Sequence, residues 1–148
     1  MKNTSHILLK TGKVIILLFL ILFFLRCDNK QNPVPNVYVD FTINLSDPQY
    51  NSVTIPGNYL YLTGGVNGII LYHTIDDQYK AFERTCTYDP DKGRVSVTSD
   101  QFFAEDSVCG SKFSLLVDGI VEQRPAEFPL KQYQCIYNQN SNTVRIRN

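Results

Sequence analysis

The stretch that decides the fold runs from Lys80 to Tyr133 and contains two short loop segments, Cys86-Thr87-Tyr88 and Cys109-Gly110-Ser111-Lys112-Phe113. The first segment follows a run of alternating residues, Tyr79 to Arg84, of the kind that forms a half-buried strand. The second segment is followed by Asp118-Gly119, a pair that favours a tight hairpin turn. This order places one cysteine on each of two loops that lie between short strands.

The order of these segments resembles a Rieske [2Fe-2S] domain, in which C-x-H on one loop and C-x-x-H on a second loop bind the cluster. In that family the second motif is followed by Gly, by an aromatic residue or Ser, and by a nearby Phe, as in Gly110-Ser111-Lys112-Phe113. The resemblance assigns the four ligand positions to Cys86, Tyr88, Asp106 and Cys109. Only Cys86 keeps the expected residue type, although the 17 residues between Tyr88 and Asp106 suit the family's loop spacing.

The ligands themselves argue against an ordinary cluster, which has two thiolates on one iron and two imidazoles on the other. The chain has two histidines, His6 near the N-terminus and His73 at the end of an upstream strand, where a surface or turn position is expected. Tyr88 is a weak ligand, and Asp106 offers a hard oxygen where iron–sulfur chemistry favours thiolate. We therefore expect a degenerate Rieske domain with no cofactor. The alternative is a Rieske-type electron-transfer protein with a [2Fe-2S] cluster of unusual ligation, or with a mononuclear metal.

The resemblance also implies that Cys86 and Cys109 are neighbours, because the equivalent positions of a Rieske domain face one small cluster. In an exported protein a close pair of thiols tends to oxidise. We therefore predict a disulfide between Cys86 and Cys109. Cys135, which lies within a predicted strand, is then left as a buried and inert thiol.

The N-terminus is typical of an export signal. Residues 1–26 carry basic residues and an apolar run, Val14–Leu25, that is too short for a stable membrane-spanning helix. Cys27 stands where a bacterial lipoprotein signal places its acylated cysteine, although Arg26 departs from the usual small residue. Residues 27–36 are polar and suit a tether, and residues 37–148 form the domain. We predict a lipoprotein of the bacterial cell envelope, held in the outer membrane through Cys27; an ordinary exported protein or a signal anchor is the alternative.

The charge of the chain restricts its partners. Four of the 14 basic residues and none of the 14 acidic residues lie within residues 1–26, so the remainder has a net charge of about −4. Such a domain lacks the basic patch that nucleic acid requires. No pairing of a nucleophile with a base indicates catalysis. We expect a non-enzymatic binding or structural module with a protein or carbohydrate partner.

Short strands separated by turn residues make up the remainder of the domain. They are expected in the alternating run from Val37 to Leu45, on both sides of the glycine loop at 64–68, and as a closing hairpin at 133–137 and 143–146. The glycine loop lacks the Lys-Ser/Thr pair of a phosphate-binding loop, and Glu105 and Asp106 are expected to be solvated loop charges. The predicted fold class is all-β: a small, antiparallel, Rieske-like sandwich or barrel with two loops corresponding to the cluster-binding loops.

Overall fold

The computed structural model describes residues 31–148. The export signal predicted for residues 1–26 and the lipidation site predicted at Cys27 lie outside the described residues. Within the described part, Asn32–Asn148 form one compact unit. No helix of residues 31–148 has the length and apolar character needed to cross a bilayer.

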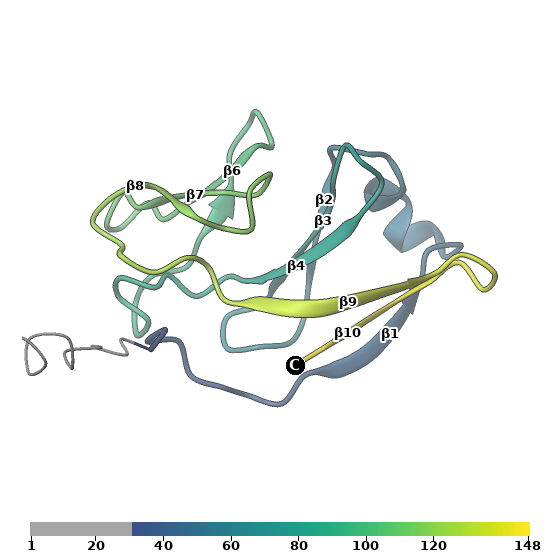
Figure 1. Cartoon of the computed structure of the whole chain (residues 1–148), viewed down its shortest axis with the longest axis horizontal. Coiled ribbons are helices and arrows are strands. Elements are labelled where there is room, and N and C mark those ends of the chain that lie inside the picture. Colours follow the sequence, from purple (N-terminus) through teal and green to yellow (C-terminus); the bar gives the residue numbers. More distant parts are fainter. Residues whose placement is uncertain (1–30) are drawn as a thin grey trace, which may run out of the picture. The chain divides into compact units, whose positions relative to one another are not determined.

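The strands of the described chain form two antiparallel sheets (Figure 1). The larger sheet has the order β1 (Asp40–Asn44), β10 (Thr143–Arg147), β9 (Gln132–Asn138), β4 (Tyr79–Glu83), β3 (Ile69–His73) and β2 (Tyr59–Leu62). The smaller sheet has the order β5 (Ser96–Val97), β6 (Phe103–Glu105), β7 (Lys112–Ser114) and β8 (Val121–Gln123). A 3-10 helix, η1 (Pro48–Thr54), lies between β1 and β2 in the chain. The all-β architecture predicted from the sequence is confirmed.

Strand β3 lies between two hydrophobic cores and is buried along its whole length. Ile69 and Leu71 belong to one core, while Ile70 and Tyr72 belong to the other. Successive side chains of a strand point to opposite faces of the sheet, so a strand that is covered on both faces needs apolar residues at every position. The run from Ile69 to Tyr72 meets this need, and its pairing with β2 and β4 confirms the strands predicted around the glycine loop.

The two cores share strands β3 and β4 and otherwise draw on different parts of the chain. The first core is built on the larger sheet from Val39, Ile43, Leu45, Val53, Ile69, Leu71, Ala81, Tyr133, Val144 and Ile146. The second core joins the two sheets and is built from Ile70, Tyr72, Phe82, Cys86, Val95, Ala104, Phe113, Leu115, Ala126 and Leu130. Cys86, the first residue of the motif that decides the fold, is therefore a core residue.

A buried carboxylate, that of Glu83 at the end of β4, ties the glycine loop to the sheet. Its Oε2 accepts hydrogen bonds from the Tyr133 hydroxyl at 2.7 Å and from the amide of Val66 at 2.8 Å. Its Oε1 accepts from the amide of Asn67 and from both the amide and the hydroxyl of Thr85. Burying a charge is costly unless it is fully hydrogen-bonded, and these five donors meet that condition. The carboxylate therefore fixes the position of the loop between β2 and β3.

The predicted hairpin at 112–121 is shorter than the sequence indicates. Strand β7 ends at Ser114, and the amide of Gly119 closes the turn by donating to Ser114 O at 2.8 Å. Asp118 and Gly119 have φ values of 47° and 70°, the left-handed backbone that a tight turn needs. Leu115 is still buried in the second core, whereas Leu116 and Val117 are 37% and 52% exposed and belong to the turn.

The packed domain begins before Val37. Val34 is buried, and Asn32 donates a hydrogen bond from its side chain to Pro129 O at 3.0 Å. Lys131 reaches back to Pro35 O at 2.8 Å. The second half of the segment expected as a tether thus lies against the domain.

Candidate metal site

The first loop of the candidate site starts where β4 ends. Thr85 pairs with Arg94 in an isolated bridge, and the amide of Cys86 donates to Gly93 O at 3.0 Å. The amide of Gly93 in turn donates to Asp89 O at 2.7 Å, so the intervening residues form a closed turn. This turn fixes Cys86 with its side chain in the second core.

The second loop joins β6 to β7 and contains Asp106 and Cys109. The amide of Asp106 donates to Ser111 O at 2.9 Å, and the amide of Gly110 donates to Asp106 O at 2.7 Å. Gly110 has a φ of 75°, which suits glycine. The Cys109 thiol donates to the hydroxyl of buried Ser111 at 3.1 Å. These bonds hold the loop as a tight turn and direct Cys109 toward the first loop.

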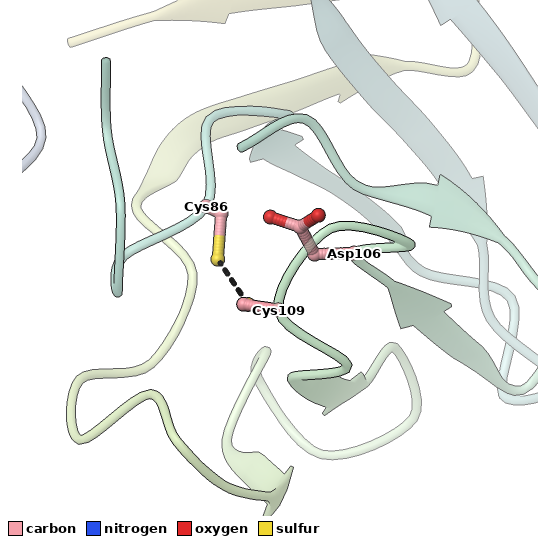
Figure 2. A group of neighbouring side chains, drawn as sticks. All are labelled: Cys86, Asp106 and Cys109. Atoms are coloured by element: carbon pink, nitrogen blue, oxygen red, sulfur yellow. Dashed lines mark hydrogen bonds between the residues drawn. The ribbon is translucent and has the colours of Figure 1, made fainter. Parts of the chain in front are cut away.

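The two loops bring Cys86, Asp106 and Cys109 together (Figure 2). One ligand atom from each residue lies within 4.8 Å of the other two, and the two sulfurs are 3.6 Å apart. Figure 2 shows the three side chains pointing toward one another, Cys86 from the first loop and the other two from the second. We call this group the thiol–carboxylate site. It contains three of the four ligand positions that the resemblance assigns.

Asp106 is fully buried, which corrects the expectation of a solvated loop charge. Its Oδ1 accepts a hydrogen bond from the amide of Val108 at 2.8 Å. Its Oδ2 is buried, and no donor of the described residues reaches it with hydrogen-bond geometry. A buried carboxylate oxygen without a partner is unfavourable, so this oxygen is available to a cation. One oxygen of the Asp106 carboxylate lies within 4.8 Å of both sulfurs.

Two further features shape the thiol–carboxylate site. A Cβ atom at Gly93 would overlap Asp106 Oδ2 and would lie 2.5 Å from Cys86 Cβ, so only glycine fits there. Burial raises the pKa of the Cys86 thiol to about 12, and the neighbouring Asp106 and Cys109 side chains also act to raise it. The sequence marks Gly93 only as a residue that can form a turn, because nothing in it shows which side chains pack against this position.

Tyr88, the fourth assigned position, is not part of the site. Its side chain is 56% exposed and lines a separate groove of about 200 Å³ together with Thr87, Pro125 and Phe128. His73 is also elsewhere, at the end of β3 and outside both loops. It is buried and stacks on Tyr79, which corrects the expectation of a surface or turn histidine.

The predicted disulfide is not formed in the structure, where Cys86 and Cys109 are free thiols. Their sulfurs are nevertheless 3.6 Å apart, in hydrogen-bond contact. Cys135 is also a free thiol; it lies in β9 and packs against the first core. Burial raises the pKa of Cys135 to about 12, so this thiol is protonated at neutral pH.

The residues present do not fit an ordinary Rieske cluster. Such a cluster needs four ligands on two irons, whereas three donor atoms converge here and the phenol of Tyr88 is exposed. In the arrangement that the resemblance implies, Cys86 takes a thiolate position and Cys109 an imidazole position, so they would serve different irons. A separation of 3.6 Å between the two sulfurs instead suits ligands that share one ion.

A Rieske protein is among the solved structures that resemble this chain in fold. A plasma-membrane Rieske protein, PetC3 from the cyanobacterium Synechocystis PCC 6803, matches with a TM-score of 0.54 and 17% sequence identity, over 76% of this chain and all of that one. A chain from the complex of reduced oxygenase and oxidized ferredoxin in carbazole 1,9a-dioxygenase matches with a TM-score of 0.46 and 23% identity, over 62% of this chain and 82% of that one. No family model and no curated protein matches the chain. The described domain is Rieske-like in fold.

The comparison corrects the expectation that the domain has no cofactor. That expectation rested on the replacement of expected ligands by Tyr88 and Asp106 and on the absence of a histidine from both loops. The fold is that of a Rieske protein, and the two loops still bring two thiols and a buried carboxylate to one point. This chain differs from the family in the types of side chain at the ligand positions. Side chains that can bind a metal ion are nevertheless still present there.

Proposed function

We propose that this chain is an envelope-anchored binding protein whose Rieske-like domain holds one divalent metal ion through Cys86, Cys109 and Asp106. The observation that carries the proposal is the buried Asp106 carboxylate, which lies beside two thiols and has one oxygen, Oδ2, without a partner. A cation bound there would satisfy this oxygen and would offset the burial that raises the pKa of Cys86.

The spacing of the sulfurs supports a single ion. Two thiolates bound to one tetrahedral Zn²⁺ at about 2.3 Å lie roughly 3.8 Å apart. The two sulfurs of this site are 3.6 Å apart before any ion is added. Little rearrangement is therefore needed for Cys86 and Cys109 to share one ion.

The ligand set favours a metal of intermediate softness. Thiolates favour soft metals and carboxylates favour hard ones, and Zn²⁺ accepts both. Three protein ligands leave the fourth tetrahedral position to water or to a partner. Cys109 is the partly exposed member of the three, whereas Cys86 and Asp106 are buried.

The position of the domain in the cell follows from the N-terminal sequence. The charged start, the short apolar run and Cys27 support export and lipidation, so the domain is held at the membrane by an acylated cysteine. When the site is empty and a disulfide-forming oxidant is present, Cys86 and Cys109 form the bridge predicted above. For that bond the sulfurs move closer by roughly 1.5 Å, to the usual S–S length.

Cobalt titration tests the metal proposal directly. The full chain, purified in detergent under reducing conditions and freed of metal by a chelator, is titrated with Co²⁺ and then with Zn²⁺. We expect a thiolate-to-cobalt charge-transfer band that saturates at one ion per chain and that Zn²⁺ abolishes. The band should be lost in Cys86→Ser and in Cys109→Ser. It should be weaker in Asp106→Asn and unchanged in the matched control Cys135→Ser.

Three results would contradict the proposal. One is the absence of a charge-transfer band in the reduced wild-type chain. Another is a band that persists when both Cys86 and Cys109 are serine. The third is the recovery of about two irons and two sulfides per chain after anaerobic reconstitution, which would favour the [2Fe-2S] alternative.

A further inference from the structure

A second site lies away from the thiol–carboxylate site, in a groove of about 520 Å³ beside the glycine loop. Its lining residues are Tyr61, Leu62, Thr63, the loop residues 64–68, Arg84 and Arg94. None of these is acidic, in a domain whose net charge is negative. The two arginines therefore give this groove a positive character within a domain whose net charge is negative.

The two arginines are positioned by different means. Arg84 is only 8% exposed, and its guanidinium lies 3.7 Å from the centroid of the Tyr61 ring. Its Nε donates to Val95 O at 3.1 Å, so the side chain is held in place. Arg94 is exposed, and its guanidinium lies close to the backbone of Gly68. One arginine is thus fixed in the wall of the groove while the other can move toward a ligand.

No carboxylate among residues 31–148 forms an ion pair with Arg84 or Arg94. The nearest acid behind the loop, Glu83, already accepts five hydrogen bonds from other groups. Two like charges that face one groove repel each other, and an anion between them would relieve this repulsion. Guanidinium groups also match the oxygens of carboxylate, phosphate and sulfate in a two-pronged geometry.

We propose that this groove binds a small ligand that carries a carboxylate, phosphate or sulfate group, with Arg84 and Arg94 as the anion-binding residues. At Gly68 a Cβ atom would lie 3.4 Å from Arg84 Cδ and 3.5 Å from Arg94 Nη2, so the absence of a side chain there leaves more room for a ligand beside the two arginines. The Arg84 guanidinium stacks on the face of the Tyr61 ring, and this cation–π contact helps to hold it in position at the groove.

Titrations followed by two-dimensional NMR test this inference on the full chain in detergent. The probes are inorganic phosphate as a bare oxyanion, glucuronate as a sugar acid and glucose as its neutral counterpart. We expect phosphate or glucuronate to shift the amide signals of residues 64–68, with glucose inactive and with affinity falling as salt is added. Binding of phosphate alone identifies a simple oxyanion site, and tighter binding of glucuronate identifies an organic acid.

Variants of Arg94 decide between this site and a general charge effect. Because Arg94 is exposed, Arg94→Gln should fold normally and should bind the anion about tenfold more weakly. Arg94→Lys should recover part of the affinity, since it keeps the charge but loses the two-pronged geometry. Arg147→Ala, on β10 and outside the groove, is the matched control and should bind as the wild type does. The inference is overturned if neither anion binds, if glucose binds equally well, or if Arg94→Gln keeps the wild-type affinity.

Discussion

Replacing Tyr133 by Phe tests how strongly the buried carboxylate of Glu83 supports the fold. The Tyr133 hydroxyl donates to Glu83 Oε2 at 2.7 Å, and Glu83 is fully buried while Tyr133 is 4% exposed. In the Phe variant, Oε2 keeps only the hydrogen bond from the amide of Val66. Hydrogen bonds to charged groups contribute about 1.5–3 kcal/mol, so we expect the free energy of unfolding to fall by about 2 kcal/mol.

Chemical and thermal unfolding measure this loss. For a domain of this size, 1 kcal/mol corresponds to a change in Tm of about 4 °C, so Tyr133→Phe should unfold about 8 °C below the wild type. Tyr137→Phe is the matched control, because the Tyr137 hydroxyl bonds to Asn142 at the exposed surface. Its free energy of unfolding should change by less than about 0.5 kcal/mol.

The pH dependence gives a second, independent check. Burial acts to raise the pKa of Glu83, but hydrogen bonds from Tyr133, the amides of Asn67 and Val66, and Thr85 outweigh it, so the folded pKa lies below its ordinary value. The stability that results is present above the unfolded pKa of about 4.3 and is lost as pH falls through the folded pKa. The difference between wild type and Tyr133→Phe should therefore be largest near neutral pH and should shrink below about pH 4. A difference as small as that of the control, or one that is constant with pH, would refute this account of Glu83.

Three further predictions follow from the backbone and from the N-terminal segment. Gly93→Ala should abolish cobalt binding and should lower the free energy of unfolding by about 1–3 kcal/mol, because the new methyl group overlaps the thiol–carboxylate site. Gly119→Ala should lower the free energy of unfolding, measured in urea titrations, by more than Gly110→Ala does. Both glycines have positive φ, but a Cβ at Gly119 would lie 3.0 Å from Leu130 Cβ, whereas the nearest atom to a Cβ at Gly110 would be 3.8 Å away. Cys27→Ser should move the protein from the membrane fraction to the soluble fraction on cell fractionation, and an unprocessed variant that stays with the membrane would instead indicate a signal anchor.

The strands could be predicted from the sequence where local pattern and tertiary environment agree. A continuous apolar run, Ile69 to Tyr72, predicts a strand that is buried on both faces. An alternating run, Val37 to Leu45, predicts a strand that is buried on one face. Strand β6 gives no such signal, because three residues, Phe103–Glu105, are too few to show a period. Strand β6 forms because it pairs with β5 and β7, and the pattern of its own three residues does not show that pairing.

The buried charged and polar groups could not be predicted from the sequence. Asp106 looks like an ordinary loop acid and Glu83 is an acid at the end of a strand, yet both are fully buried. Composition assigns such residues to the surface, since burial of a carboxylate depends on donors or ligands far away in the chain. The meeting of Cys86 with Cys109 was predicted because a family resemblance supplied the missing tertiary information. The carboxylate that completes the site was then assigned only as a degenerate ligand.

The three side chains of the thiol–carboxylate site come from loops of both sheets. Cys86 follows β4 of the larger sheet, whereas Asp106 and Cys109 lie between β6 and β7 of the smaller one, whose strands are only two or three residues long. Short strands with few hydrogen bonds are the first to open by local unfolding. An ion bound across the two sheets would oppose that opening in proportion to its occupancy. Hydrogen exchange at β6 and β7 should therefore slow when metal is added, while exchange at β1 and β10 stays unchanged. The stability of the smaller sheet, and of any surface that packs against it, would then depend on whether metal is bound.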